Sequence, residues 1–186
     1  LVQKNISAIL FVRGALMEDP QNFAKIVRAI QKGFLIGNHS YAHERTSHIG
    51  FDAQTSQISK TQDLIERAYA AAGLTQPIKT FRFPHLDRGC GNAYVADFES
   101  FPSAYRDAAQ KLFWDGVRLE NTDRPTPEQV QLKCDIQKWL TSEGFKALPT
   151  PKVTHPWFCD TELGQAVDTL ITYSTSDWMI LPRHLG

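Results

Sequence analysis

Hydrophobic and polar residues follow two different periods in the first half of the chain. Short apolar runs at Ile6–Val12, Phe34–Ile36 and Thr80–Phe83 predict buried strands. Apolar residues at helical spacing predict two helices between these runs, one over residues 19–33 and one over residues 56–72. This alternation of strands and helices predicts βαβ units and a parallel sheet, so the fold class we expect is α/β.

The second half is less regular. Residues 84–102 are rich in Gly, Asp and Arg and predict a long loop. The pattern then predicts helices over residues 102–113, 127–143 and 162–173, and short strands over residues 145–148 and 178–181. No internal repeat divides the chain, so we expect residues 1–186 to form a single domain.

Composition and charge narrow the class of protein. The chain has 186 residues, 42% of them hydrophobic, with 20 basic and 20 acidic side chains. A balanced charge lacks the basic excess of a general nucleic-acid binder, so no nucleic-acid partner is expected. No apolar run approaches the ~20 residues of a membrane-spanning helix. The cysteines are odd in number and match no metal-binding spacing, which favours buried free thiols: Cys90, Cys134 and Cys159.

Two histidines follow the second predicted strand, in the segment His39-Ser40-Tyr41-Ala42-His43. Imidazoles four residues apart on a turn or a first helical turn point the same way and can share one metal ion. The carboxyl end of a strand is also where α/β proteins collect ligands. The alternative is a chance pair of surface histidines.

Two further segments hold candidate chemistry. Arg82 and Pro84 follow the third predicted strand, where a guanidinium can orient a carboxylate or simply support the strand end. Asp177 and Trp178 begin the last apolar run. The carboxylate can tune a histidine or cap a segment, and the indole can face a sugar or join the core. His85 can contact a substrate or belong to an ordinary polar loop.

In this order and spacing, the three segments resemble the polysaccharide deacetylases of carbohydrate esterase family four. His39 to His43 match that family's H-[ST]-x-x-H motif in full. Arg82 and Pro84 match the start of R-x-P-[YF]-G, which departs at His85. Asp177 and Trp178 resemble its Asp-Trp motif. The resemblance implies a distorted (β/α) barrel, which is incomplete in this chain, with a probable insertion around residues 85–150.

The resemblance also implies roles for these residues. His39 and His43 would bind a divalent metal, most commonly zinc. Arg82 would orient the catalytic base and Asp177 would tune the general acid. Pro84, His85 and Trp178 would lie against the substrate, an N-acetylated polysaccharide or a related small amide.

The family's first and last motifs are not found in the sequence. Either T-F-D-D-G, with the base and the third metal ligand, precedes Leu1 in a longer protein and the final Leu-x-His follows Gly186, or the chain is a relative that has lost the base. Asp52, Asp87 and His48 are candidates for a third ligand, and the pattern does not choose among them. We therefore expect hydrolysis only when the missing segments are restored. Loss of a first strand would leave an open sheet edge, which favours a homo-oligomer.

Two other functions fit the same residues. One is a barrel that binds a glycan or a metal without turnover, and the other is a hydrolase of small C–N amide compounds on the same fold. No export signal is visible in the sequence. A wall-modifying enzyme would work outside the cytoplasm, but the sequence does not determine the compartment.

Overall fold

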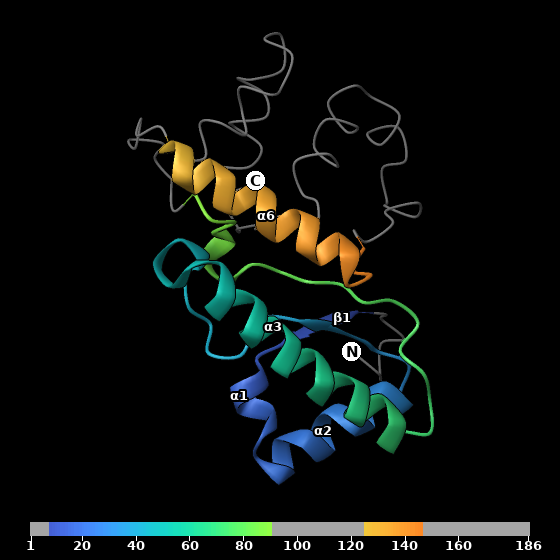
Figure 1. The fold of residues 1–186 in the computed structure, drawn as a ribbon. Helices are drawn as coiled ribbons and strands as arrows, with labels where there is room; N and C mark the ends of the chain where they lie inside the picture. The colour runs from blue at the N-terminus through green and yellow to red at the C-terminus, as the bar shows by residue number, and fades with distance from the viewer. Residues whose placement is uncertain (1–7, 91–124, 147–186) are drawn as a thin grey trace, which may run out of the picture.

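The computed structural model describes residues 8–90 and 125–146 (Figure 1). In chain order these hold β1 (Ile9–Val12), α1 (Gly14–Met17), α2 (Pro20–Gln31), β2 (Leu35–Asn38), α3 (Thr46–Ala71), the 3₁₀ turn η2 (Pro84–Leu86) and α6 (Pro127–Ser142). The predicted helices over 102–113 and 162–173 and the predicted strand over 178–181 lie outside the described residues.

The two strands β1 and β2 pair in parallel, with Ile9 opposite Leu35 and Val12 opposite Asn38. The α2 helix connects them, so the predicted βαβ unit is present and the described part of the chain is mixed α/β. Two isolated parallel bridges, Asn38 with Phe81 and Lys79 with Phe145, extend the pairing. No closed barrel forms within residues 8–90 and 125–146.

The strand predicted at Thr80–Phe83 is wrong, because this segment makes a single bridge to Asn38 instead of a ladder. Side chains occupy the neighbouring edge of β2. The Ile36 N–H donates to the Tyr69 hydroxyl at 3.1 Å, and the Ile36 carbonyl accepts from the Gln76 amide at 3.2 Å. With those backbone groups already bonded, the chain can pair with β2 only at Asn38.

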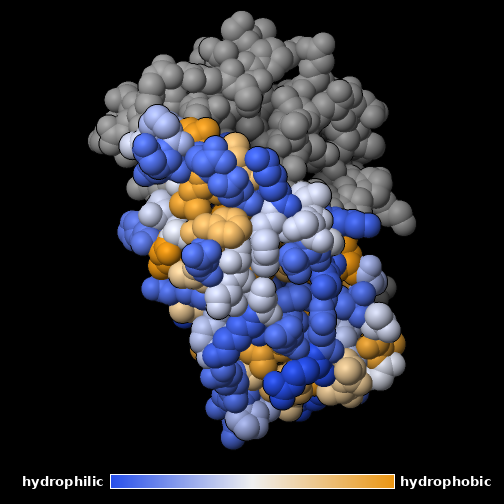
Figure 2. Space-filling view, in the orientation of Figure 1, coloured by the Kyte–Doolittle hydropathy of each residue, from blue (hydrophilic) through white to orange (hydrophobic). Residues whose placement is uncertain are grey.

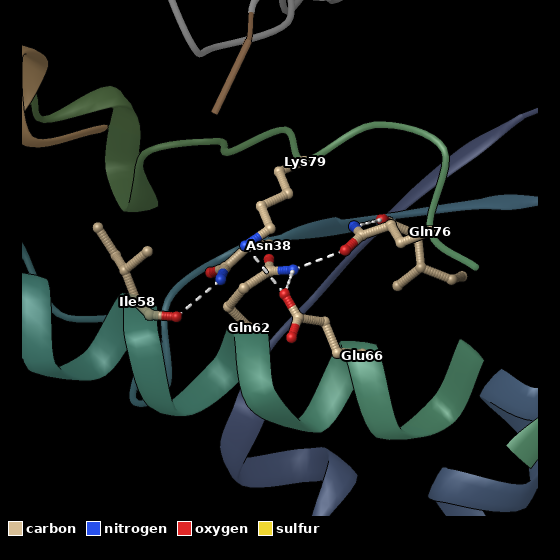
Figure 3. A network of polar contacts seen from close by, with 7 residues as sticks. Asn38, Ile58, Gln62, Glu66, Gln76 and Lys79 are labelled. Carbon is tan, nitrogen blue, oxygen red and sulfur yellow. Dashed lines mark hydrogen bonds and ion pairs between the residues drawn. The ribbon is translucent and has the colours of Figure 1, made fainter. Parts of the chain in front are cut away.

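A polar network that includes the buried Gln62 holds the segment after α3 in this position (Figure 3). The Gln62 amide donates to Gln76 at 2.6 Å and to Glu66 at 3.1 Å, and Lys79 forms an ion pair with Glu66 at 3.0 Å. Gln62 belongs to α3, so the helix fixes Gln76 and thereby the edge of β2.

Local signals define α2 as the sequence predicts. The Asp19 carboxylate accepts from the N–H groups of Gln21 at 2.8 Å and Asn22 at 3.0 Å, and Pro20 occupies the first helical position. Gly33 ends the helix with a φ of 83°. Buried Ile30 lies on the helix face that packs against the core.

The α3 helix begins at Thr46, not at Ser56 as predicted. Gly50, with φ 76° and ψ −174°, separates a first turn from the rest of the helix. This backbone region is accessible essentially only to glycine. The turn lacks a local side-chain cap at Arg45, and one of its N–H groups is bound instead by Asp87, 40 residues away from Ser47.

The α6 helix begins as predicted, with a capping box between Thr126 and Gln129. Figure 1 shows α3 between α6 on one side and α1 and α2 on the other. Two hydrophobic clusters fill these spaces. The first includes Met17, Ile30, Ile36, Leu64, Ile65, Ala68 and Tyr69, and the second includes Ile58, Phe81, Phe83, Ile136, Leu140 and Phe145.

On the face shown in Figure 2, hydrophobic side chains are interrupted by hydrophilic ones. The exposed large apolar residues are Leu16 of α1, Phe51 of α3, Leu74 in the segment after α3 and Val130 of α6. None of the described helices is long and apolar enough to cross a membrane. Neither Cys90 nor Cys134 forms a disulfide; Cys90 is buried, as expected, whereas Cys134 is half-buried. Cys159 lies outside the described residues.

Candidate functional site

The two candidate metal-binding histidines lie on the loop between β2 and α3. Their Nε2 atoms are 3.0 Å apart, and their ring centroids lie 4.7 Å apart at an interplanar angle of 70°. The two imidazoles therefore meet at their Nε2 atoms, on a loop between a strand and a helix. The His39 N–H donates to the Val12 carbonyl at 3.0 Å, which places the pair at the carboxyl ends of β1 and β2.

The second ring nitrogen of His39 fixes its tautomer. His39 Nδ1 lies 2.8 Å from the Arg82 carbonyl oxygen, and a carbonyl can only accept, so Nδ1–H is the donor. In the neutral ring Nε2 then carries a lone pair directed at His43. A histidine whose outer nitrogen donates to a backbone carbonyl is the arrangement usual for metal ligands.

Burial favours the neutral form of both imidazoles. It lowers the pKa of His39 from its ordinary 6.5 to about 4, with smaller contributions from His43, Arg82 and Arg13 and an opposing one from the bond to the Arg82 carbonyl. Burial also lowers the pKa of His43, assisted by the charges of His85 and Arg13. Two neutral nitrogens facing one point suit a divalent cation, which cannot bind protonated imidazole.

This environment predicts a pH dependence for the metal-free chain. We expect NMR titration of the His39 ring protons to give a pKa of about 4. An unfolded histidine titrates near ~6.5, so the free energy of unfolding should be greatest above about pH 6.5 and fall as the pH drops toward about 4. His39→Ala should remove this part of the dependence. A His39 pKa at the unfolded value would contradict the prediction.

The backbone of the site is unusual. Ser40, His43 and His85 have φ values of 61°, 66° and 55°, and they are the non-glycine residues with positive φ in the described ranges. Such conformations are each unfavourable by roughly 1–3 kcal/mol and persist where surrounding contacts hold them. All three belong to the loops that form this site.

The start of α1 holds the histidine loop through its carbonyl groups. The Gly14 N–H donates to Ser40 at 3.0 Å and the Ala15 N–H donates to Tyr41 at 3.1 Å. Gly14 permits this approach, because a Cβ there would lie 2.6 Å from the Tyr41 ring. The Arg13 guanidinium donates to the Ala42 carbonyl at 3.3 Å.

Sequence reasoning missed two amides that hold the same loop. Asn38 is fully buried, and its Nδ2 donates to the Ile58 carbonyl at 2.8 Å while its Oδ1 accepts from the Ser40 N–H at 2.9 Å. Gln57 of α3 binds Ser40, Ala42 and Glu44. A polar residue ending a buried strand is a signal for Asn38, whereas Gln57 has no local signal in the sequence.

The segment after residue 81 lies beside the histidine pair. The Arg82 backbone binds His39, and its half-buried guanidinium lies 6.0 Å from the Phe11 ring centroid. The His85 ring is 4.6 Å from that of His43, and its Nε2 donates to the His43 carbonyl at 3.2 Å. The exposed His85 thus lies next to the pair, and the buried Pro84 precedes it in the chain.

The candidates for a third ligand do not join the pair. Within residues 8–90 and 125–146, no group of three or more His, Cys, Asp and Glu side chains could hold a metal ion. Asp52 and His48 are exposed on α3. Asp87 is fully buried, and its carboxylate accepts from Ser47 N at 3.0 Å, Ser47 Oγ at 2.6 Å and Gly89 N at 2.9 Å. Asp177 and Trp178 lie outside the described residues.

These features define a mixed α/β protein with a paired-imidazole site at the carboxyl end of a parallel strand. The polysaccharide deacetylase family model matches residues 1–97, which include both histidines, Arg82 and Pro84. The chain therefore belongs to the polysaccharide deacetylase family. This confirms the resemblance drawn from the motifs.

Individual relatives agree with this assignment. The chain is 35% identical over 68 residues to a peptidoglycan-N-acetylglucosamine deacetylase of Bacillus cereus, a match over 36% of this chain and 24% of that protein. The chain thus spans about a quarter of the length of this curated relative.

Solved structures give a weaker likeness. A family 4 carbohydrate esterase from Streptomyces lividans in complex with acetate is 22% identical, with 78% of this chain and 79% of that chain covered and a TM-score of 0.38. A family 4 acetyl xylan esterase from Clostridium thermocellum with a cobalt ion is 24% identical, with 77% and 74% covered and a TM-score of 0.39. At these TM-scores the likeness carries no structural argument.

Proposed function

We propose that this chain carries the two-histidine part of the metal site of a polysaccharide N-deacetylase. The observation that carries the proposal is the 3.0 Å separation of the His39 and His43 Nε2 atoms, with His39 Nδ1 bonded to a backbone carbonyl. Membership of the deacetylase family supports the reaction class. We propose a divalent metal, zinc, because imidazole nitrogen is one of its preferred ligands.

Each side chain of the site has a distinct task in this proposal. When bound, the metal would supply Lewis-acid activation of the amide carbonyl and of water. His39 and His43 hold it as neutral nitrogen donors. Arg82, whose backbone already orients His39, directs its guanidinium to the carboxylate that serves as base. Asp177 tunes the general acid.

The substrate we propose is a glycan containing N-acetylglucosamine. The Bacillus relative is a peptidoglycan-N-acetylglucosamine deacetylase, which supports this sugar. The exposed His85 ring beside His43 suits a hydrogen bond to a sugar hydroxyl, and the buried Pro84 shapes the loop that presents it. Trp178 would form an apolar wall against the sugar ring. A wall glycan would place the enzyme outside the cytoplasm.

The fold we propose is a distorted, incomplete (β/α) barrel in a single domain. Parallel pairing of β1 with β2, and the bridges that continue it to residues 79–81 and 145, support this arrangement. The α6 helix lies within residues 85–150, and its Ile136 and Leu140 pack into the same cluster as Ile58 and Phe81. At least this part of the proposed insertion therefore shares the core of the domain.

Metal binding tests the proposal directly. We expect the purified chain to bind about one zinc ion, measured by mass spectrometry and by competition with a chelator. His39→Ala and His43→Ala should each weaken binding at least ~10-fold, the loss expected even for an outer-shell partner. His48→Ala, which removes an exposed histidine of α3, should bind as the wild type does.

Two outcomes would contradict the metal site: no zinc in the wild type, or equal affinity in His39→Ala. Acetate release then separates the substrate classes. Release from N-acetylglucosamine oligomers supports a glycan deacetylase, whereas release from small amides alone points to the other hydrolase. Zinc binding without release from either, by a protein with all family motifs present, would indicate a binding protein.

A further inference from the structure

Gln57 contacts the histidine loop through both ends of its side-chain amide. Its Oε1 accepts from Ser40 Oγ at 2.9 Å and from the Ala42 N–H at 2.8 Å. Its Nε2 donates to the Glu44 carboxylate at 2.6 Å. Gln57 lies on α3, so this half-buried side chain ties the middle of the loop to the helix.

The identity of the side chain follows from these partners. A backbone N–H such as that of Ala42 can only donate, and a carboxylate such as that of Glu44 can only accept. The residue between them must therefore present an acceptor at one end and a donor at the other. Glutamine does this, whereas glutamate would face Glu44 with a second carboxylate, and a hydrocarbon would leave Ala42 without its acceptor.

The two loop residues whose donors Gln57 accepts from, Ser40 and Ala42, lie between the two histidines. Ser40 and His43 both have left-handed backbones, with φ values of 61° and 66°. Loop residues held in such conformations relax when their contacts are removed. Asn38 and Gly14 bind Ser40, near His39, whereas Gln57 also binds Ala42, the residue immediately before His43. The bond to Ala42 therefore constrains the backbone that carries the second imidazole.

We infer that Gln57 is a positioning residue for the metal site: it holds the His43 imidazole close enough to that of His39 for both to bind one metal ion. The inference rests on the proposed function for its chemical consequence, namely metal affinity. The other part of the inference, that Gln57 holds residues 40–44 in one conformation, does not depend on any metal.

The test compares Gln57→Ala with Gln62→Ala in the full chain. Gln62 is a matched control, because it is a buried glutamine of the same helix whose amide bonds Glu66 and Gln76, away from the histidine loop. In the metal-free chain, Gln57→Ala should speed hydrogen exchange of the Ala42 amide at least ~10-fold over the control. It should also weaken zinc binding ~10–100-fold, as loss of an outer-shell partner does. Gln62→Ala should change neither quantity by more than about threefold.

Exchanging the glutamine at position 57 with the glutamate at position 44 distinguishes a positioning role of Gln57 from a general loss of structure. Gln57→Glu alone should weaken zinc binding, and Gln57→Glu combined with Glu44→Gln should restore it to within about threefold, because donor and acceptor have traded places. Unchanged Ala42 exchange in Gln57→Ala, or equal loss of zinc in Gln57→Ala and Gln62→Ala, would overturn the inference. If the wild type binds no zinc, the proposed function fails, and the exchange measurement still decides whether Gln57 holds the loop.

Discussion

Replacing Asp87 with alanine is expected to destabilise the protein by about 3 kcal/mol. The carboxylate is fully buried and accepts from two backbone N–H groups, those of Ser47 and Gly89, and from the Ser47 hydroxyl. Alanine leaves those two N–H groups without their acceptor, and each buried unsatisfied group is unfavourable by roughly 1–3 kcal/mol. The same change frees the segment that carries Arg82 and His85 from the first turn of α3. Urea denaturation gives the free energy of unfolding.

Two variants control for this effect. Ser47→Ala removes the hydroxyl bond and keeps both backbone bonds, so a loss of about 1 kcal/mol is expected. Asp63→Ala replaces an exposed aspartate of α3 and should lie within about 0.5 kcal/mol of the wild type. An Asp87→Ala chain as stable as Asp63→Ala would show that the carboxylate does not hold the two segments together.

The second large effect is expected for Asn38→Ala, which should lower the free energy of unfolding by roughly 2–4 kcal/mol. This fully buried amide joins β2 to α3 through the Ile58 carbonyl (Figure 3) and also joins β2 to the histidine loop through the Ser40 N–H. Alanine removes both bonds, leaves the Ser40 N–H without that acceptor and opens a cavity. Thermal and urea denaturation measure the loss.

Asn38→Asp tests the orientation of this amide. The new carboxyl group would keep the acceptor for Ser40 but face the Ile58 carbonyl with an oxygen. Burial would raise its pKa above the unfolded value of ~3.9. The protonated form can donate to Ile58, so stability should be closest to the wild type below about pH 4 and be lost as the pH rises through the folded pKa. Stability independent of pH would contradict the assigned orientation.

The part of the fold predictable from sequence is the part whose determinants are local. Asp19 and Pro20 start α2 and Gly33 ends it, all within one stretch of chain. The first turn of α3 and the failed strand at Thr80–Phe83 depend on distant residues. Asp87 binds that turn from 40 residues away, and Gln76 reaches the Ile36 carbonyl over the same separation. Hydrophobic periodicity contains no information on such bonds.

The residues of the candidate site are also of two kinds: some are predictable from local sequence patterns, and the others depend on distant contacts. The spacing of His39 and His43 gives their shared direction, and the deacetylase motifs gave Arg82 and Pro84 as neighbours. The residues that hold these side chains in place are Asn38, Gln57 and Asp87. Asp87 was one of three candidates for a third ligand, because the sequence pattern does not distinguish an aspartate that binds the start of a helix from one that binds a metal.

One helix determines the geometry of both site loops. The histidine loop is bound by Gln57, and the loop after residue 84 is bound through Ser47, in the turn that Gly50 joins to the helix. Inserting or deleting one residue in α3 would rotate its parts by about 100° and bring another side chain toward the loop. The interval of 15 residues from Ala42 to Gln57 should therefore be more constant among related sequences than the residues inside it. A gap in that interval would mark a relative that holds its histidines by other means.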